Sequence, residues 1–388
     1  MDSIKKPIVI VGCGFAGVNT ALTLKRNNPS LPILVVDSKS KFIFKPLLYE
    51  VLSNEIKTWE VAPSFEHIFL NSGITFLQNK LIKINLSKRS LHFEDDLIIN
   101  YHLLVLCTGS SPNNFSIKGV DEYCYFFNNI DDQNKLKNFL EENKISLARK
   151  KIFIVGAGPS GVELACKIYD LHNKFEICLI ESTGDILNKN KLYNREEAEK
   201  ALQKRNIKLL LNTTVKEISP SEIKVIDKLN QILNLKHDAV IWTAGIKANL
   251  PNIDENIRTV NGRIFVNNKL QLNSFQDVFA IGDIAVVDGN NDLPITAQVA
   301  MQQGKHVSKN IYLKIHNKDL LPFEFKDNGE MISLGLGEAS ISGLGLTCSG
   351  KLAFDLRRLI YASKMPALEK GLKSTASWLI DKKSIFFK

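Results

Sequence analysis

Short apolar runs and helical patterns alternate along most of the chain, and this alternation predicts parallel strands joined by helices. A strand, a glycine-rich turn, a helix and a second strand occur in that order twice. The predicted elements are strand 7–11, helix 16–27 and strand 31–36 in the first unit, and strand 151–155, a helix ending near 172 and strand 176–180 in the second. The repeated order predicts an α/β fold with two parallel sheets.

The remaining segments supply further predicted elements. Strands are predicted over 85–93, 103–107, 229–242, 263–266 and 278–281, and helices over 130–143 and 296–313. A hairpin is predicted where strands over 323–325 and 331–334 flank Asp327-Asn328-Gly329. The tail from Leu352 has a helical pattern that is interrupted at Pro366.

The length of the chain predicts more than one domain, because 388 residues exceed one ordinary core. We expect one domain from residues 1–118 and 251–322, a second from 119–250, and a C-terminal hairpin with helices from 323–388. No stretch approaches the roughly 18 apolar residues of a membrane-spanning helix. The apolar run at 8–11 is too short for a signal peptide.

The first glycine turn, Gly12-Cys-Gly14-Phe15-Ala16-Gly17, directly follows a predicted strand and opens a helix. In this pattern the first glycine makes the tight turn, the second lets the backbone approach a pyrophosphate, and the third lets the helix pack on the strand. The helix N-terminus attracts phosphate groups. Asp37 lies twenty residues after Gly17, where its carboxylate can accept hydrogen bonds from an adenosine ribose. These features predict a dinucleotide site.

A second turn, Gly156-Ala-Gly158-Pro159-Ser160-Gly161, repeats the pattern, with Glu181 twenty residues after Gly161. A carboxylate at this place bonds a free ribose 2′-hydroxyl and repels a 2′-phosphate. Ser182 and Thr183 supply no cation to offset that repulsion. The second site is therefore expected to prefer NADH to NADPH.

Two such sites on one chain resemble the two-dinucleotide-binding flavoproteins, which hold FAD at one site and receive NAD(P)H at the other. Residues 104–109 and 241–245 are similar to the crossover segments of that superfamily, and residues 274–283 to its second FAD motif. The resemblance implies two Rossmann-like domains, FAD-binding (1–118 and 251–322) and NAD(P)H-binding (119–250), and no metal. Beyond the first turn and Asp37, it implies FAD contacts from Ser38, Lys45, Pro46, Leu47, Thr108, Gly109, Gly282, Asp283, Ala297, Gln298 and Val299. Beyond the second turn and Glu181, it implies NAD contacts from Glu163, Ala244 and Gly245.

Three segments, 44–51, 161–165 and 297–304, resemble type II NAD(P)H dehydrogenases, which are single-chain, non-pumping quinone reductases. The segment 349–358 is most similar to the cyanobacterial and plastid demethylphylloquinone reductase branch. Asp37 and His102 depart from that pattern, which usually has Glu and Asp. The implied reaction takes hydride from NADH to FAD and then two electrons to a membrane quinone. The sequence does not distinguish a naphthoquinone such as demethylphylloquinone from plastoquinone.

The resemblance assigns catalytic roles to Glu163, Gln298, Gln302 and Lys351. It places Glu163 near the nicotinamide, where a carboxylate orients the dihydronicotinamide or relays a proton; a glutamate early in a helix also simply suits the helix dipole. Gln298 and Gln302 share a helix face and are expected to bond a quinone carbonyl, although such a pair is otherwise an exposed polar face. Lys351 is expected near the quinone, although a lysine in a tail is otherwise solvated.

The C-terminal region carries most of the net charge of +9, because residues 351–388 hold seven Lys and two Arg against three acids. Apolar residues recur there at helical spacing: Leu352, Leu356, Leu359 and Ile360, then Leu368, Leu372, Ala376 and Leu379. Arg357, Arg358 and Lys364 fall elsewhere on the circumference, and Trp378 lies near the end. An apolar face beside a basic face predicts helices lying on an anionic membrane surface.

We therefore expect a peripheral protein on the cytoplasmic face of a membrane, thylakoid or plasma membrane if the source is cyanobacterial, with no nucleic-acid partner. The alternative is that the helices pack on the protein's own core or on a second subunit of a homodimer. Two other functions remain open. A sulfide:quinone oxidoreductase shares the fold and needs cysteines beside the flavin, for which Cys166 and Cys348 are the candidates. An NADH-sensing flavoprotein without a catalytic role would show slow turnover with every quinone.

The six cysteines are spaced singly, and none forms a Cys-x-x-Cys pair. This spacing predicts reduced thiols in a cytoplasmic compartment. It also argues against the flavoproteins that reduce disulfides, because those enzymes need a redox-active cysteine pair beside the flavin.

Overall fold

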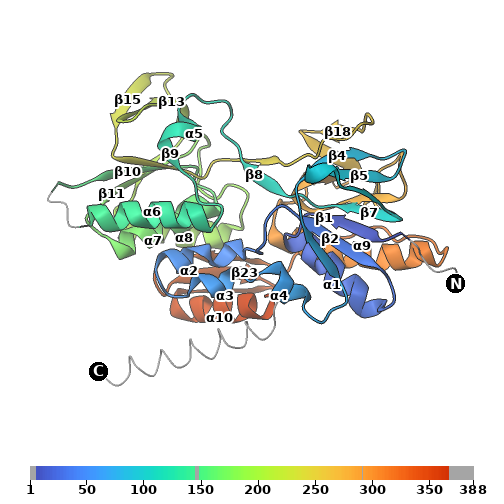
Figure 1. Ribbon diagram of the computed structural model, residues 1–388. Helices are drawn as coiled ribbons and strands as arrows, with labels where there is room; N and C mark the ends of the chain where they lie inside the picture. Colours follow the sequence, from blue (N-terminus) through green and yellow to red (C-terminus); the bar gives the residue numbers. More distant parts are fainter. Residues whose placement is uncertain (1–5, 145–147, 291, 367–388) are drawn as a thin grey trace. The chain divides into compact units, whose positions relative to one another are not determined.

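The structure is a computed structural model that describes residues 6–144, 148–290 and 292–366, and it contains two compact units (Figure 1). Unit 1 consists of Met1–Ile43, Ala62–Ser111 and Lys247–Lys326. Unit 2 consists of Phe44–Val61, Pro112–Ile246 and Asp327–Lys388. Each unit is therefore assembled from three separate stretches of sequence, and each contains one of the two glycine turns.

The main sheet of unit 1 is parallel and has the strand order β20-β7-β1-β2-β3. Its strands are β1 (Ile8–Val11), β2 (Ile33–Asp37), β3 (Thr75–Gln78), β7 (Leu103–Leu106) and β20 (Val278–Ala280). Strands β1, β7 and β20 are buried along their whole length, which explains why the sequence shows them as continuous apolar runs. The fold class predicted from the sequence is confirmed in this unit.

Two long helices, α1 (Phe15–Asn27) and α9 (Ala297–Ile315), lie side by side in unit 1 (Figure 1). They approach closely because a glycine stands at their contact: a Cβ on Gly304 would lie 2.6 Å from the Ala16 carbonyl oxygen. The Ser308 hydroxyl also donates to the Thr20 carbonyl oxygen at 3.0 Å. This packing fixes α9 against the helix that follows the first glycine turn.

Smaller elements complete unit 1. They are β4 (Leu81–Asn85), β5 (Ser90–Phe93), β6 (Ile98–Asn100), β18 (Thr259–Val260), β19 (Arg263–Val266), β21 (Ala285–Val287), α4 (Phe65–Phe69), η2 (Glu94–Asp96) and η3 (Gly282–Ile284). The single strand predicted over 85–93 is wrong, because the chain turns there and forms the β4–β5 hairpin. The Asn85 side chain closes the turn by accepting a hydrogen bond from the Lys88 backbone N–H at 2.7 Å.

The main sheet of unit 2 is also parallel, with the order β12-β11-β10-β16-β9. Its strands are β9 (Cys124–Tyr125), β10 (Lys151–Val155), β11 (Glu176–Ile180), β12 (Lys208–Leu210) and β16 (Ala239–Trp242). One face packs on the helices α6 (Ile130–Asn143), α7 (Pro159–Leu171) and α8 (Leu192–Lys204). The other face packs on the antiparallel strands β13 (Thr214–Ile218), β14 (Glu222–Ile226) and β15 (Ile232–Lys236).

The stretches 44–61 and 327–366 add a further layer to unit 2. They form η1 (Lys45–Leu47), α2 (Leu48–Leu52), α3 (Thr58–Val61), β22 (Glu330–Ser333), β23 (Ala339–Gly343), β24 (Leu346–Ser349) and α10 (Gly350–Ser363). Helix α5 (Val120–Tyr123) also belongs to this unit. Strands β8 (Ser110–Pro112) and β17 (Ile246–Ala248) pair with each other, and each contains a point where the chain passes between units.

The hairpin predicted around Asp327-Asn328-Gly329 is wrong. Strand β22 does follow that turn, but it pairs with β23, and residues 323–325 form no strand. The backbone of the preceding segment is bonded elsewhere: the Phe323 N–H donates to the Asn268 carbonyl oxygen at 2.7 Å, and the Gln302 side chain bonds the backbone of Lys326. Asp327-Asn328-Gly329 is therefore a turn before β22, but no strand precedes it to complete a hairpin.

Helix α10 confirms the helix predicted from Leu352 onward. The second predicted stretch, from Leu368 to Leu379, lies outside the described residues. Within the described ranges, no helix is both long enough and apolar enough to cross a bilayer.

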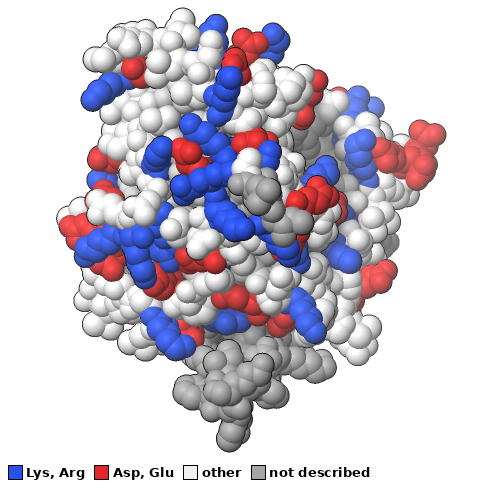
Figure 2. Space-filling model, turned by 90° about the vertical axis from the view of Figure 1, so that its left-hand side faces the viewer, with Lys and Arg blue, Asp and Glu red and all other residues white. Residues whose placement is uncertain are grey.

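Charged side chains of both signs share the surface seen in Figure 2, where basic side chains gather with acidic ones among them. Ion pairs also join charged residues at the start of the strands of unit 2. Lys150 pairs with Asp238 at 2.9 Å, and Lys208 pairs with Glu176 at 2.7 Å.

Candidate functional site

The carboxyl ends of the parallel strands in unit 1 gather four of the predicted FAD motifs. The first glycine turn follows β1, and Asp37 ends β2. Thr108 and Gly109 follow β7, and Gly282 and Asp283 follow β20. Because these strands are neighbours in one sheet, the four motifs lie along one edge, which is where open α/β sheets bind ligands.

The first glycine turn fits a dinucleotide pyrophosphate. Gly12 has a φ of +99°, and a Cβ on it would lie 2.3 Å from the Cys107 carbonyl oxygen. A Cβ on Gly17 would lie 2.0 Å from the Gly12 carbonyl oxygen. A Cβ on Gly14, by contrast, would meet no atom within 4 Å. The outer glycines are thus required by the fold, whereas the middle one leaves open space at the N-terminus of α1, where a phosphate group would sit.

The Asp37 carboxylate is held against the first glycine turn. One oxygen accepts from the Cys13 backbone N–H at 2.7 Å, and the other accepts from the Lys39 N–H at 2.9 Å. The side chain is therefore oriented by the backbone of the turn. Its predicted contact with the adenosine ribose, like the predicted contacts of Phe15, Ala16 and Ser38, stays a prediction.

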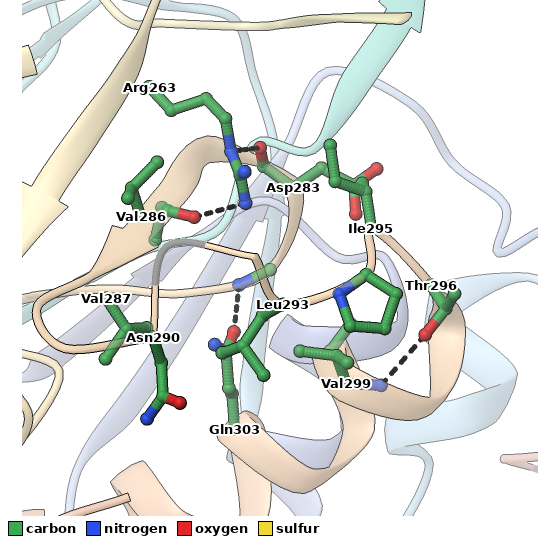
Figure 3. A pocket seen from close by; sticks show the side chains of 14 residues that line it. Arg263, Asp283, Val286, Val287, Asn290, Leu293, Ile295, Thr296, Val299 and Gln303 are labelled. Carbon is green, nitrogen blue, oxygen red and sulfur yellow. Dashed lines mark hydrogen bonds between the residues drawn. The ribbon is translucent and has the colours of Figure 1, made fainter. Parts of the chain in front are cut away.

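A pocket opens beside Gly282 and Asp283 in unit 1 (Figure 3). Its other lining residues are Arg263, Ala285, Val286, Val287, Asn290, Leu293, Pro294, Ile295, Thr296, Val299, Ala300 and Gln303. The Ser110 hydroxyl donates to the Asp283 carboxylate at 2.5 Å, and Arg263 donates to the Asp283 carbonyl oxygen at 3.0 Å. The structure thus brings the predicted FAD residues Gly282, Asp283 and Val299 together at one cavity.

Gln303 is a residue of this pocket that sequence reasoning missed. Its side chain is buried, and its Oε1 accepts from the Gly282 N–H at 2.6 Å, which ties the second FAD motif to α9 (Figure 3). It stands inside the glutamine-containing segment quoted above, but nothing in the helical spacing separates it from its neighbour Gln302. Only the inward orientation of the side chain distinguishes it.

The predicted quinone-binding glutamines lie on the first two turns of α9. The helix is capped by the Thr296 hydroxyl, which accepts from the Val299 N–H at 3.3 Å, so Ala297, Gln298 and Val299 form its first turn. The Gln302 amide bonds the Lys326 backbone on both sides, at 2.8 and 3.0 Å. Gln302 therefore holds the end of unit 1 in place, and its role toward a quinone stays a prediction.

The second glycine turn, in unit 2, repeats the geometry of the first. Gly156 has a φ of +100°, and a Cβ on Gly161 would lie 1.8 Å from the Gly156 carbonyl oxygen. A Cβ on Gly158 would meet nothing within 4 Å. Across the turn, the Thr243 hydroxyl donates to the Val155 carbonyl oxygen at 2.8 Å, which places Ala244 and Gly245 beside it. Pro159 occupies the first turn of α7, where its missing N–H costs nothing.

Glu181 directly follows β11 and places a negative charge beside this second turn. Its carboxylate accepts from the Ala157 N–H at 2.8 Å and from the Thr183 N–H at 2.9 Å. Partial burial raises the pKa of this carboxyl, but these backbone bonds and the Ser182 and Thr183 hydroxyls outweigh burial and hold the pKa below its usual value. The carboxylate is thus ionised at neutral pH, as discrimination against a 2′-phosphate requires.

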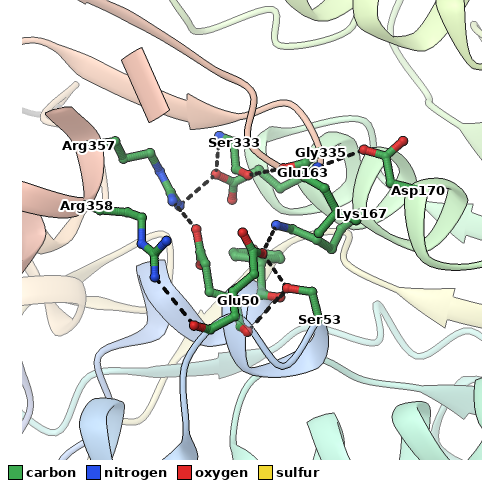
Figure 4. Close-up of polar contacts among 12 residues, drawn as sticks. Glu50, Ser53, Glu163, Lys167, Asp170, Ser333, Gly335, Arg357 and Arg358 are labelled. Atoms are coloured by element: carbon green, nitrogen blue, oxygen red, sulfur yellow. Dashed lines mark hydrogen bonds and ion pairs between the residues drawn. The ribbon is translucent and has the colours of Figure 1, made fainter. Parts of the chain in front are cut away.

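Glu163 lies on α7, two residues after Gly161, and its side chain is buried (Figure 4). Its Oε1 accepts from the Ser333 N–H at 2.8 Å and lies 3.4 Å from Arg357 Nη2. Burial raises the pKa of this carboxyl to about 7, although Arg357 and the Ser333 bond lower it. Glu163 is therefore a carboxyl group that can gain or lose a proton near neutral pH.

Arg357 joins Glu163 to a second buried carboxylate. Its Nη1 donates to Glu50 Oε1 in a very short contact, and its Nη2 donates to the Pro46 carbonyl oxygen at 2.7 Å (Figure 4). Both side chains of the Arg357–Glu50 pair are fully buried. The prediction that Arg357 belongs to a basic, outward face of the C-terminal helix is wrong. The reason is its counter-ion, which lies 307 residues earlier and leaves no trace in the local pattern.

The remaining predicted site residues, Lys45, Pro46, Leu47 and Lys351, lie in unit 2, and their contacts there do not test their predicted roles. Lys351 lies in the first turn of α10, and its exposed ammonium group is 3.9 Å from the Asp355 carboxylate. Lys45 donates to the Asn128 side chain at 2.6 Å, and Leu47 is buried in η1 beside Pro46. The FAD contacts expected of residues 45–47 and the quinone contact expected of Lys351 stay predictions.

All six cysteines are free thiols. Burial raises the pKa of Cys166 to about 12, so this thiol is protonated at neutral pH and is a poor nucleophile. Cys348 is half-buried on β24. In the part of the chain that the structure describes, no three His, Cys, Asp or Glu side chains cluster as metal ligands.

Residues 6–304 match the family described as pyridine nucleotide-disulphide oxidoreductase. The chain is 32% identical to a demethylphylloquinone reductase of Synechocystis, over 98% of this chain and 97% of that protein. It is 30% identical to an alternative NAD(P)H-ubiquinone oxidoreductase of Arabidopsis thaliana, over 97% of this chain and 81% of that protein.

Solved structures share the fold. NDH2 of Plasmodium falciparum in complex with NADH superposes with a TM-score of 0.85 at 18% identity, covering 96% of this chain and 98% of that one. A sulfide:quinone oxidoreductase of Aquifex aeolicus gives a TM-score of 0.79 at 18% identity, covering 95% and 92%. At such identities the likeness concerns the fold alone.

Proposed function

The chain belongs to the pyridine nucleotide-disulphide oxidoreductase family and, within it, to the type II NAD(P)H:quinone oxidoreductases, and on this premise we propose that it reduces a quinone with NADH. The observation that carries the proposal is the pair of glycine turns. Each has two glycines enclosed by backbone and a middle glycine facing open space, and in each a backbone N–H donates to a carboxylate at the carboxyl end of the next strand. Two dinucleotides therefore fit one chain.

Unit 1 would hold FAD through the turn around Gly14, with Asp37 toward the ribose, Asp283 toward the ribityl chain and Val299 at the start of α9. When bound there, FAD would supply the redox chemistry, which is hydride acceptance from the dihydronicotinamide and two-electron reduction of a quinone. Unit 2 would bind the pyrophosphate of NADH at Gly158 and its ribose at Glu181. The ionised Glu181 carboxylate disfavours NADPH, which carries an additional phosphate there.

Glu163 is proposed to act on the nicotinamide side, where it would orient the dihydronicotinamide or hold a proton for quinone reduction. A carboxyl group that titrates near pH 7 suits both tasks. For the acceptor we propose a naphthoquinone of the demethylphylloquinone type, because a demethylphylloquinone reductase is 32% identical over nearly the whole chain. Gln298 and Lys351 are proposed to contact it.

The sulfide:quinone alternative is disfavoured by the state of Cys166, one of its two candidate cysteines. Sulfur transfer needs a reactive thiolate, whereas Cys166 is buried with a raised pKa. The intact second glycine turn and Glu181 also have no use in an enzyme that takes electrons from sulfide.

We further propose that unit 2 docks on an anionic membrane surface through α10 and the β23–β24 hairpin. Ala353 and Phe354 pack α10 on β23, which turns Leu352 and Leu359 outward with exposed fractions of 64% and 50%. At the hairpin tip, Leu344 and Leu346 are exposed to 80% and 75%. Exposed leucines on adjoining elements are typical of a surface that enters the lipid interface. Such docking would bring the enzyme to a lipid-soluble acceptor.

Steady-state turnover of the purified full-length protein tests the proposal. We expect NADH oxidation with a short-chain naphthoquinone and slower oxidation of NADPH. Sulfide should not replace NADH as the electron donor. Quinone reduction with sulfide and none with NADH would overturn the proposal, and slow turnover with every quinone, joined to NADH-dependent self-association, would favour a sensing role.

A further inference from the structure

Two carboxylates compete for one arginine in the buried cluster of unit 2 (Figure 4). Glu50 comes from α2, Glu163 from α7 and Arg357 from α10, so three separate stretches of sequence supply one ion cluster. The Arg357–Glu50 contact is the shorter, since Arg357 Nη2 lies 3.4 Å from Glu163. Arg357 is therefore paired mainly with Glu50.

The neighbouring cation has its own counter-ion. Lys167 is fully buried and pairs with Glu55 at 2.5 Å. Arg357 and Lys167 therefore each have a nearer carboxylate than Glu163. Taking a charge out of water is costly unless a partner compensates it, so the least compensated carboxylate in such a cluster is the one that keeps a proton.

The groups that face Glu163 come from four elements. They are Tyr49 and Glu50 on α2, Lys167 on α7 itself, Arg357 and Tyr361 on α10, and the Ser333 N–H on β22. Burial raises the pKa of both tyrosines, that of Tyr361 to about 12, so these phenols are neutral at pH 7. Burial raises the pKa of Glu50, but Arg357 and Lys167 outweigh it and hold that pKa below its usual value. Glu50 is consequently the ionised carboxylate of the pair.

We propose that Glu50 is a positioning residue for Glu163: by taking the charge of Arg357, it leaves Glu163 as a proton-carrying carboxyl group beside the second glycine turn. The proton would sit on Glu163 Oε2, because Oε1 already accepts from Ser333 and faces Arg357. Glu50 thus acts on Glu163 through Arg357, which lies between the two carboxylates.

The pH titration of the Glu163 carboxyl tests this assignment directly. We would follow the carboxyl carbon resonances of glutamate-labelled holoenzyme by NMR and identify Glu163 from the signal lost in Glu163→Gln. In Glu50→Gln the arginine is released to Glu163, so the titration midpoint should fall by about one to three pH units. A midpoint that is unchanged or raised in Glu50→Gln would overturn the proposal.

Arg357→Gln should move the midpoint in the opposite direction, upward, because Glu163 then loses its nearest cation and keeps only Lys167, which is paired with Glu55. This second variant keeps the test decisive if Glu50→Gln does not fold, since an unchanged or lowered midpoint in Arg357→Gln also contradicts the coupling. The matched control is Glu60→Gln, which neutralises another buried glutamate of the same stretch and should leave the midpoint in place. Opposite shifts from two variants are not expected of residues that only stabilise the fold.

The consequence for turnover rests on the proposed function. If quinone reduction draws a proton from Glu163, kcat should decline as pH rises through the Glu163 midpoint, and in Glu50→Gln this decline should begin at lower pH by the same shift. The NMR titration uses neither NADH nor quinone. A failed titration therefore refutes the role of Glu50, whereas an intact titration without turnover refutes the quinone reductase activity.

Discussion

The three glycines of each turn make different demands at the residue scale. Gly158 and Gly161 are a matched pair, because both lie in unit 2 and both would become alanine by adding one methyl group. At Gly158 the methyl group enters open space, and at Gly161 it collides with the Gly156 carbonyl oxygen at 1.8 Å. The fold therefore tolerates one change and not the other.

Gly158→Ala should keep its flavin and melting temperature but raise the KM for NADH about tenfold or more, since losing roughly 1.4 kcal/mol of binding is a factor of ten. Gly161→Ala should lower the melting temperature by several degrees instead. Thermal unfolding and steady-state kinetics measure both. A Gly158→Ala protein with unchanged KM would contradict the placement of the pyrophosphate.

Glu181 is the residue that should decide between the two nicotinamide nucleotides. Replacing it by Gln keeps an acceptor for a ribose hydroxyl but removes the charge that repels a 2′-phosphate. We expect the ratio of kcat/KM for NADPH to that for NADH to rise about tenfold. Glu176→Gln, at the other end of β11, is the control and should leave the ratio unchanged. The same NADPH-to-NADH ratio in both variants would show that Glu181 does not decide between the two nucleotides.

At the scale of elements, hydrophobic periodicity predicted correctly those helices and strands whose ends depend on residues close by in the sequence. The helix over 130–143 and the strand over 176–180 have the predicted bounds, because their ends coincide with an Asn129 cap and with a continuous apolar run. The prediction of a hairpin around residues 327–329 was wrong, because the backbone of the segment before the turn is hydrogen-bonded to other segments and forms no strand. The Glu50–Arg357 pair was missed because a contact between residues 307 positions apart has no local signature.

The residues of the candidate site likewise include some that the sequence predicts and some that it does not. The glycine turns and their acids were predictable, since each depends on a spacing within one βαβ unit. Gln303 and Glu50 were not, because their roles depend on which side of a helix faces the interior. The inward position of Arg357 also changes the picture of α10, whose outward face is apolar where Leu352, Leu356 and Leu359 are exposed.

The exposed leucines of α10 should contribute to membrane binding. Leu352→Ser combined with Leu359→Ser should weaken binding to anionic vesicles at least tenfold, because burying one leucine contributes roughly 1.5–3 kcal/mol. Vesicle cosedimentation measures the loss. Leu229→Ser is the control, since Leu229 has a comparable exposed fraction of 65% on a turn of unit 2. If neither variant changes vesicle binding but the double variant alters the oligomeric state, the surface binds a second copy instead.

At the scale of the whole molecule, each unit is assembled from three stretches of the chain and contains one of the two glycine turns. The segments 44–61 and 327–366 join the unit that contains the second glycine turn. The C-terminal helix and the nucleotide turn thereby share one buried ion cluster. The proposed function therefore assigns one dinucleotide to each unit, FAD to unit 1 and NADH to unit 2, and flavin reduction by NADH can be measured without any knowledge of the natural quinone.

The most direct measurement is the absorbance of the purified protein in two anaerobic half-reactions. The protein should carry about one FAD per chain, as expected for one such site; its yellow absorbance should bleach on adding NADH and return on adding a naphthoquinone. A colourless protein with an intact fold, or a flavin band that NADH leaves unchanged, would contradict the account.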